Sequence, residues 1–456
     1  MDYLELIKEI WELDRVHSSP QMREAYSKVA SFYEGATLLE YPAGAKCGAM
    51  GSWAVPQSWK VNHALLKGPS GETVCSYEEN PLRLFAYSPA FKGSVSLEEL
   101  NGHLMSNPLR PNAIPFHFRN QYRPWERDWG FCLTETERQN LVEGDYFVDI
   151  DVEFVDDPMV QLEMIKEGET DKRILFVGHF DHPAMINDGL AGCIAANEVI
   201  KRLADRKTRF TYVSLNAVEI VGSTAYCSFE KEKIKKTEEA LFVALAGNKA
   251  PFAYQTSNYP QGSLIDRVIK HMLRWRQPEA LIGGFREIMG NDEISFETPG
   301  VSIPCGSILR WPLEEYHTSD DNFENLSPEA MEETIAFLLD FVEILEENKI
   351  VEPLFEGLPC FSHPDLDLYL APAFMSQMKQ DHQSDDRLTI GLSPNEIEFL
   401  KENPDAPNQF MNKLPSVLSR SEPIDVLSLS EDCGMPFRFV SNYLSLLSKK
   451  NLLKFG

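Results

Sequence analysis

The sequence predicts an α/β fold with a mostly parallel sheet flanked by helices. Apolar runs at residues 173–177, 210–215 and 240–245 read as strands, and an amphipathic stretch at residues 190–203 between the first two reads as a helix. Near-continuous apolar strands are typical of parallel sheets that are buried on both faces. The length of 456 residues, with 43% hydrophobic and 25% charged content, indicates two or three domains.

The amino terminus is expected to form two helices. Apolar residues recur at near-helical spacing between residues 4 and 13, and a second amphipathic stretch covers residues 21–33. Ser18, Ser19 and Pro20 precede this second stretch, which suits a helix cap with proline in the first turn. We assign residues 1–40 to the same domain as residues 150–375.

Residues 41–149 are predicted to form a separate, β-rich inserted domain, called the insert below. Short apolar or aromatic runs, such as residues 52–55 and 84–87, are separated by Gly-Pro-Ser-Gly, Asn-Pro and Arg-Pro turns. The segment also interleaves basic and aromatic side chains. Because the chain is so acidic, we expect these side chains to pack the insert or to line the mouth of a cleft; they are Arg119, Tyr122, Arg123, Trp125, Arg127 and Trp129.

The carboxyl-terminal part is expected to be helical. Ser327 and Pro328 suit the start of a long helix that runs to about residue 347, and the polar stretch at residues 375–387 reads as a linker. Residues 388–456 contain three or four short helices and a final apolar run, a pattern that predicts a winged helix. From residue 391 onward there are 7 basic and 8 acidic residues, so packing or protein interaction is favoured over DNA binding.

The overall charge and the cysteines restrict the class of protein. Lys and Arg number 43 against 70 Asp and Glu, a net charge of −27 that repels nucleic acid and anionic lipid. The eight cysteines occur singly, without a CxxC pair, which is typical of a reduced intracellular protein. The amino terminus is acidic, and no apolar run approaches the roughly 20 residues of a membrane span. We therefore predict a cytoplasmic protein.

Polar motifs follow the predicted strands, where ligands bind in open α/β sheets. After residue 177 come His179, Asp181 and His182, and Asp188 then opens a helix. A His followed at two residues by Asp supplies a metal ligand and a carboxylate that can orient an imidazole, and Asp188 adds a hard oxygen ligand. The alternative for this segment is a loop with a helix cap.

Three further motifs lie beside other apolar runs. Glu219 is a lone carboxylate after the strand at 210–215, where burial would raise its pKa towards the range of a general base; a solvent-facing glutamate is the alternative. Asp292 and His317 stand in two more acidic or His-bearing turns. Four such turns beside predicted strand ends indicate one site.

Taken together, these motifs carry a resemblance. Gly-His-Phe-Asp, Asn-Asp-Gly-Leu-Ala-Gly, Glu before Gly-Ser, Asn-Asp-Glu-Ile-Ser-Phe and Tyr-His-Thr-Ser-Asp-Asp resemble the site motifs of the leucyl-aminopeptidase type of zinc exopeptidases. More closely, the chain resembles a bacterial family of aminopeptidase-like proteins with a β-rich insert and a carboxyl-terminal winged helix. The sequences at residues 53–59, 129–132, 299–300 and 316–319 match that closer family.

The resemblance implies a role for each matching residue. His179, Asp188 and Asp292 would face one metal position, Asp188 and His317 would face a second, and Glu219 would be the base. The exopeptidases carry a second glutamate directly after the base, and here that residue is Ile220. One carboxylate ligand is therefore missing, which favours one zinc ion over two.

Two departures leave alternatives open. The closer family has His-x-Cys-His-Pro where this chain has residues 179–183, so either His179 or His182 could be the ligand, and His182 could equally be a structural histidine. The Asp-Asn-Leu-Ser-Gly sequence that is usual in the closer family is replaced here by Asp-Gly-Leu-Ala-Gly, starting at Asp188.

Arg310, before the His317 turn, could bind a substrate carboxylate or a developing oxyanion; an ordinary surface arginine is the alternative.

The predicted function is zinc-dependent hydrolysis of an amide or peptide bond in a small substrate with a free amino group. The alternative is a scaffold without catalysis that binds a ligand or partner and signals through the winged helix. The expected partners are the small peptide or amide substrate and, as an option left open, further copies of the chain. In the exopeptidase pattern the sheet starts soon after the first helices, so the insert is expected to form a lid or wall over the zinc site, with Trp129 among its aromatic residues.

Overall fold

The computed structural model describes residues 2–259, 262–372, 386–420 and 422–456. The chain divides into two compact units. The first contains Met1–Ile265 and Leu281–Leu338, and the second contains Asp266–Ala280 and Leu339–Gly456. The first unit holds the predicted strand-helix alternation and the insert.

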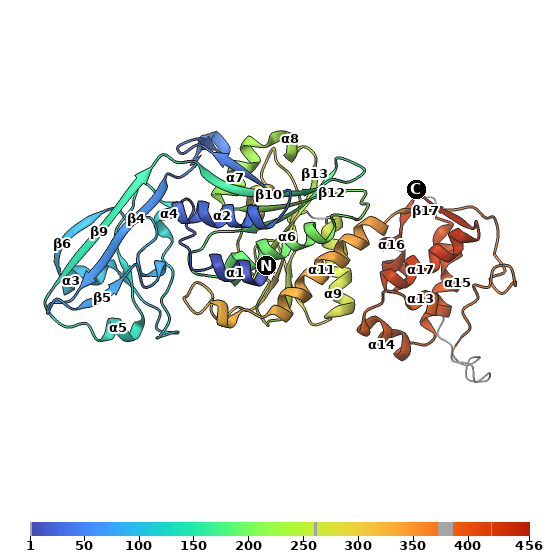
Figure 1. The fold of residues 1–456 in the computed structure, drawn as a ribbon. Coiled ribbons are helices and arrows are strands. Elements are labelled where there is room, and N and C mark those ends of the chain that lie inside the picture. The colour runs from blue at the N-terminus through green and yellow to red at the C-terminus, as the bar shows by residue number, and fades with distance from the viewer. Residues whose placement is uncertain (1, 260–261, 373–385, 421) are drawn as a thin grey trace. The chain divides into compact units, whose positions relative to one another are not determined.

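A mixed sheet of eight strands forms the centre of the first unit (Figure 1). In spatial order the strands are β1 (Thr37–Tyr41), β10 (Met159–Lys166), β12 (Thr211–Ala217), β11 (Arg173–His179), β13 (Thr237–Ala244), β16 (Cys305–Arg310), β14 (Phe252–Gln255) and β15 (Leu281–Gly283). Strands β12, β11, β13 and β16 are parallel to one another, whereas β1, β10 and β14 pair with antiparallel neighbours. The predicted parallel arrangement therefore describes the middle of the sheet.

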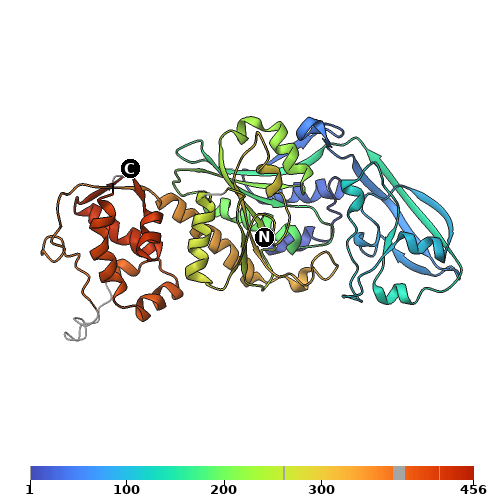
Figure 2. The ribbon, with the colours of Figure 1, turned by 180° about the vertical axis from the view of Figure 1, so that it is seen from behind.

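Helices cover both faces of this sheet (Figure 1 and, from behind, Figure 2). On one face, α2 (Pro20–Phe32) packs on β1 and β10, and α6 (Gly192–Arg202) packs on β10, β12, β11 and β13, where Asn197 of α6 donates to Asn216 of β12. On the other face, Tyr226 of α7 (Val221–Phe229) packs with Leu175 and Val213. Alternate residues of each strand thus point into two separate cores. Three shorter helices also belong to this unit, α1 (Tyr3–Ile10), α8 (Lys231–Ile234) and α10 (Glu293–Phe296), and the long helix α11 (Pro328–Glu347) begins in it and continues into the second unit from Leu339.

Local capping explains where several helices begin. The side chain of Asp2 accepts from Glu5 N at 2.9 Å at the start of α1, and Ser19 Oγ accepts from Met22 N at 2.9 Å at the start of α2. Ser327 plays the same role for α11. Each cap satisfies a main-chain N–H that has no partner within the helix. The helix starts predicted at Pro20 and Pro328 are confirmed.

The insert contains a four-stranded antiparallel sheet with its own core. In spatial order the strands are β5 (Thr73–Ser76), β4 (Ser58–Lys67), β9 (Asp145–Val155) and β6 (Phe91–Ser96), and β4 and β9 lie side by side in Figure 1. Strand β9 continues beyond the predicted boundary at residue 149. Residues 84–87, expected to be strand-like, form only an isolated bridge between Leu84 and Phe131. The smaller elements are β2 (Lys46–Cys47), β3 (Trp53–Ala54), α3 (Leu97–Leu100), β7 (Leu104–Met105), α4 (Arg119–Tyr122), β8 (Phe131–Cys132) and α5 (Glu135–Gln139).

The second unit combines helices with a three-stranded sheet ordered β18-β17-β19. Its elements are α9 (Leu264–Arg276), β17 (Ile350–Pro353), α13 (Asp386–Thr389), α14 (Pro394–Glu402), α15 (Ala406–Leu418), β18 (Ile424–Asp425), α16 (Val426–Cys433), α17 (Phe437–Lys449) and β19 (Leu453–Phe455). The first two residues of α9 belong to the first unit. The predicted short helices are present, and the winged-helix assignment stays a prediction.

The predicted linker falls mainly on residues 373–385, which lie outside the described residues, and Asp386 already begins α13.

Among the helices of the described chain, none combines the length and the apolar character that crossing a bilayer requires. The predicted boundaries of three domains also stay a prediction.

Candidate metal centre

The carboxyl edge of the parallel strands brings the predicted site residues together. His179 is the last residue of β11, Glu219 comes two residues after β12, and His317 follows β16. Asp292 precedes α10 as its N-cap residue. From β11 the chain continues to β12 on one side, and the next strand, β13, pairs with β11 on the other. This reversal of strand order is where open α/β sheets bind ligands.

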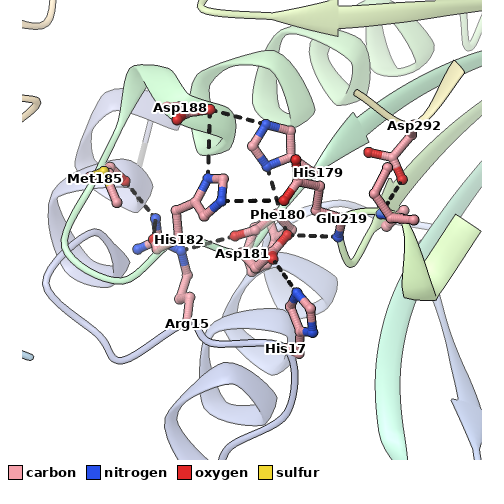
Figure 3. A network of polar contacts seen from close by, with 12 residues as sticks. Arg15, His17, His179, Phe180, Asp181, His182, Met185, Asp188, Glu219 and Asp292 are labelled. Atoms are coloured by element: carbon pink, nitrogen blue, oxygen red, sulfur yellow. Dashed lines mark hydrogen bonds and ion pairs between the residues drawn. The ribbon is translucent and has the colours of Figure 1, made fainter. Parts of the chain in front are cut away.

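Asp188 lies at the centre of the cluster (Figure 3). Its Oδ1 is 3.2 Å from His179 Nε2 and 3.6 Å from His182 Nδ1. Its Oδ2 is 3.0 Å from His317 Nε2. The two oxygens of one carboxylate therefore face histidines on two sides, as a carboxylate shared between two metal positions would.

Asp292 lies beside the Glu219 turn, outside the two groups of described side chains whose atoms are close enough to share one ion. Its Oδ1 accepts from Ile220 N at 2.9 Å and from the Ser223 hydroxyl. Its Oδ2 is buried and has no hydrogen-bond partner among the described residues. One oxygen thus fixes the side chain, and the other is left for a ligand.

Several polar atoms of the cluster are buried without a hydrogen bond in the described part of the chain. They are His179 Nδ1 and Nε2, His182 Nδ1, Asp188 Oδ2, Asp292 Oδ2 and His317 Nε2. Buried polar atoms are nearly always paired in folded proteins, so such a group needs an explanation. Imidazole nitrogens and carboxylate oxygens are the donors that zinc prefers, and His179, His182 and Asp188 are close enough to share one ion. The residues present therefore fit a zinc site.

The pKa values show that the cluster attracts positive charge. Burial lowers the pKa of His179, but Asp181 and Asp188 outweigh burial and raise it to about 10. Burial also lowers the pKa of His182, but Asp188 outweighs burial, and the pKa of His182 lies well above its usual value. Burial alone would raise the pKa of Asp188, but His182 and His179 outweigh burial and hold this pKa well below its usual range. The carboxylates thus favour a proton or a cation among them.

The two remaining carboxyl groups shift in opposite directions. Burial raises the pKa of Glu219, but His182 and His179 bring it below its ordinary value. Burial acts in the expected direction, but the expected net rise of the Glu219 pKa is wrong, because His182 and His179 lie close to the carboxylate. Asp292 shows the raised pKa instead, about 7, because burial and the charge of Glu219 act together against His179 and Ser223.

The loops that carry the site contain several strained residues. His182, Ala184, Ile220 and His317 are not glycine, yet all have positive φ, between 50° and 77°. Such conformations cluster at functional sites, where the surrounding structure holds them in place. Gly189 is required for a different reason: a Cβ there would lie 2.4 Å from the carbonyl oxygen of His179. This close approach accounts for glycine directly after Asp188.

Arg15, which sequence analysis did not select, holds the loop between His179 and Asp188. The side chain is buried, and its guanidinium donates to the carbonyl oxygens of Phe180 (3.1 Å), His182 (2.9 Å) and Met185 (2.5 Å). It also donates to the carbonyl oxygens of Ile10 and Trp11 at the end of α1. One side chain therefore ties the amino-terminal helix to the loop between His179 and Asp188.

Two other carboxylates orient the cluster. Asp181 Oδ1 is 3.7 Å from His179 Nδ1 and accepts from Glu219 N at 2.9 Å, and Asp181 Oδ2 is 3.5 Å from His17 Nε2. The predicted role of Asp181, to orient an imidazole, stays a prediction, because His179 Nδ1 makes no hydrogen bond among the described residues. Asp321 accepts from the main-chain N–H of Asp188 at 2.8 Å and fixes the start of that turn.

A segment of the insert forms one side of the site. Phe116 N donates to His317 O at 2.9 Å, and Ser319 N donates to Ile114 O at 2.9 Å, so the segment pairs with the His317 turn. The ring of Phe116 packs edge-on against His182 and His317. Further along the segment, the Tyr122 hydroxyl donates to Glu219 Oε2.

Other members of the predicted basic and aromatic run take different places. Trp129 is buried inside the insert, where it stacks on His103 and Phe91. Its predicted place in the wall of the site is therefore wrong, because neighbours within the insert cover the ring. Arg127 lies over the rings of Tyr87 and Phe154.

Arg310 is not brought to the cluster. The side chain is buried rather than on the surface, and it donates to Thr334 Oγ1 at 3.0 Å, Ala250 O at 2.9 Å and Glu333 Oε2 at 2.5 Å. Every one of these contacts is structural, which favours a packing role over substrate binding. The last residue of a strand need not point towards the ligand edge.

Sequence reasoning missed Arg15, His17 and Tyr122 because no motif marks them. Arg15 and His17 lie between two helices, and a charged or polar residue there normally faces water. Tyr122 belongs to a run that was predicted to pack the insert or to line the mouth of a cleft, and this was the available signal. All three reach the site through contacts of high sequence separation.

Fold and site together define a mixed α/β protein whose large, helix-flanked sheet is similar to that of the M28 peptidases. A zinc aminopeptidase of Bacillus subtilis has a TM-score of 0.54 at 11% identity, over 74% of this chain and 93% of that one. An M28 peptidase precursor of Shewanella amazonensis has a TM-score of 0.53 at 13% identity, over 78% and 93%. At these identities the comparison shows the fold.

The chain belongs to the family described as "Domain of unknown function (DUF4910)", whose profile matches residues 4–348. A curated relative from Clostridium acetobutylicum, 28% identical over 65% of this chain and 68% of its own length, is described as a polysaccharide biosynthesis protein with an aminopeptidase-like domain. A crystal structure from the same organism, described as a peptidase, has a TM-score of 0.81 at 23% identity and covers 99% of this chain and 96% of that one. The predicted resemblance to an aminopeptidase-like family is confirmed.

Proposed function

We propose that this protein is a zinc-dependent hydrolase of amide or peptide bonds in a small substrate with a free amino group. The observation that carries the proposal is the convergence of buried His and Asp side chains beside Glu219 at the carboxyl edge of the sheet, several of whose polar atoms make no hydrogen bond among the described residues. The aminopeptidase-like relative and the peptidase-like fold support the same class of reaction.

Five residues would hold the metal. His179, Asp188 and Asp292 would face one position, and Asp188 with His317 a second; His182 lies near enough to Asp188 to replace or supplement His179. Bound zinc would supply Lewis-acid activation of a water molecule and of the scissile carbonyl. Ile220, in place of a carboxylate, favours a single ion.

Glu219 would act as the general base. Its main-chain N–H donates to Asp181 Oδ1, so the base is tied to the loop that carries His179. Its carboxylate would take a proton from the attacking water and hand it to the leaving amine. With its pKa below the ordinary value, Glu219 is ionised at neutral pH and ready to accept that proton.

The contact between the insert and the His317 turn supports a small substrate. Because residues 114–118 run beside His182 and His317, they limit the space on that side of the site. A folded protein would fit there less easily than an amide or a short peptide.

The cytoplasmic location stays a prediction from the pattern of single cysteines, which form no disulfide among the described residues.

Metal analysis of the purified protein is the first test. We expect about one zinc ion per chain by mass spectrometry of the digested protein, and restoration of the same content when metal-stripped protein is titrated. A protein that neither contains nor takes up zinc would overturn the proposed mechanism.

The second test changes the base. Glu219→Gln should keep the zinc content while turnover of the best aminoacyl amide or dipeptide falls by about 10²- to 10⁴-fold. Glu198→Gln is the matched control, because Glu198 is also buried but pairs with Lys201 and Arg202 on α6. Turnover retained in Glu219→Gln would mean that another group is the base.

The alternative is a binding scaffold without catalysis, and the observation that favours it is Ile220 at a position where the exopeptidases carry a ligand. Libraries of aminoacyl amides and dipeptides separate the two functions. An enzyme releases product, whereas a scaffold gives thermal shifts with the same compounds and no product.

A further inference from the structure

Tyr122 connects the insert directly to the proposed base. It is the last residue of α4, and its hydroxyl donates to Glu219 Oε2. The same carboxylate oxygen is 3.6 Å from His182 Nε2. Among the described residues no side chain is hydrogen-bonded to the other oxygen, Oε1, which leaves it for a water or a substrate proton.

The structure around Tyr122 fixes its position. The ring packs edge-on against His17, with centroids 5.0 Å apart, and against Phe118 at 6.1 Å. Next to it, the Gln121 side chain accepts from His17 N at 3.2 Å. The Asn120 side chain donates to Asp128 O at 2.8 Å and accepts from Asp128 N at 3.2 Å, which braces the turn after α4.

These contacts close a ring around the base. His17 lies against Tyr122 and 3.5 Å from Asp181 Oδ2, while Asp181 Oδ1 accepts from Glu219 N. Glu219 is therefore held twice: at its main chain by Asp181 and at its carboxylate by Tyr122. A carboxylate held at one oxygen cannot turn freely about its last side-chain bond, so Oε1 keeps one direction.

We propose that Tyr122 is a positioning residue, supplied by the insert, that holds the Glu219 carboxylate so that Oε1 faces the reacting water. The inference rests on the proposed role of Glu219 as base. It gives the insert a part in the reaction beyond limiting the substrate, because the base is fully oriented only when the insert is packed against the His317 turn. A displacement of about 1 Å at a catalytic group can cost about 10²-fold in rate.

Tyr122→Phe is the direct test, since it keeps the ring contacts and removes only the hydroxyl. With the best aminoacyl amide, we expect kcat to fall by about 10- to 100-fold while KM stays within about twofold and the zinc content is unchanged. Tyr77→Phe is the matched control. Tyr77 also lies in the insert and donates to a buried carboxylate, Asp14 Oδ2 at 2.8 Å, so that variant should keep kcat.

A double-mutant cycle shows whether Tyr122 acts through Glu219. In the Glu219→Gln background, Tyr122→Phe should lower kcat no further, because the group that it positions is already lost. A kcat within about twofold of the wild type in the single variant, or a full additional loss in the double variant, would overturn the proposal. An inactive wild-type protein would instead refute the proposed function, and the role of Tyr122 with it.

Discussion

Replacing Arg15 with methionine tests whether the loop between His179 and Asp188 depends on a single buried cation. The guanidinium makes five hydrogen bonds to carbonyl oxygens, three of them in residues 180–185 of the loop. Methionine fills a similar volume but donates nothing, so these carbonyls lose their partner in a region that water does not reach.

The expected loss of stability follows from these contacts. A hydrogen bond to a charged group contributes about 1.5–3 kcal/mol, but five of them are not additive, because part of the loop can relax. A buried carbonyl oxygen that loses its partner costs about 1–3 kcal/mol. We therefore expect Arg15→Met to lower the free energy of unfolding by about 4 kcal/mol. Lysine, with three donors, should give an intermediate loss.

Thermal unfolding and zinc titration measure the two consequences. We expect the unfolding midpoint to fall by roughly 10 °C and zinc affinity to fall by about 10- to 100-fold, as for other supports of metal ligands. Arg23→Met is the control, because Arg23 is half-exposed and pairs with Glu40 on the surface, where a pair contributes at most about 1 kcal/mol. If Arg15→Met were no less stable than Arg23→Met and bound zinc as tightly as the wild type, the reasoning would be refuted.

Two further predictions concern the pH dependence of stability and the substrate. Burial raises the pKa of Asp14 to about 7, although Tyr77 and Arg15 act in the opposite direction, so the folded state binds this proton more tightly than the unfolded chain. This contribution to the free energy of unfolding is complete below about pH 4 and is lost as the pH rises to about 7, by up to about 1.4 kcal/mol per pH unit. In urea unfolding measured over this pH range, Asp14→Asn should remove this pH dependence. An unchanged pH dependence would exclude Asp14 as its source. Phe118 is 38% exposed beside His317, and Phe118→Asp should lower kcat/KM for leucine amide relative to lysine amide by about 10-fold or more, since apolar contacts of this size contribute about 1–3 kcal/mol to specificity. The same substitution at the exposed Trp125 should leave this ratio unchanged, and a ratio unchanged in both variants would mean that Phe118 does not contact the substrate.

The candidate site was only partly accessible from sequence. His179, Asp188, Glu219 and His317 could be found because each directly follows or lies near a strand, and parallel strands bring their carboxyl ends to one edge. The direction of the Glu219 pKa could not be found, because it depends on His182 and His179, whose distances only folding sets. A buried group titrates according to the charges packed around it, and sequence does not list those neighbours.

By itself, the sequence determined most of the elements and the edge of the sheet at which the candidate site lies. Continuous apolar runs, amphipathic stretches and caps such as Ser19 extend over a few residues, so they can be recognised without a structure. Only the tertiary structure decided which side chains support the site. Arg15 reaches the carbonyls of residues 180–185, and Tyr122 reaches Glu219, through contacts between segments about 100 or more residues apart. It also decided that Arg310 and Trp129 are packed away from the site. These outcomes depend on how segments that are distant in sequence pack against one another, and a local sequence pattern does not contain that information.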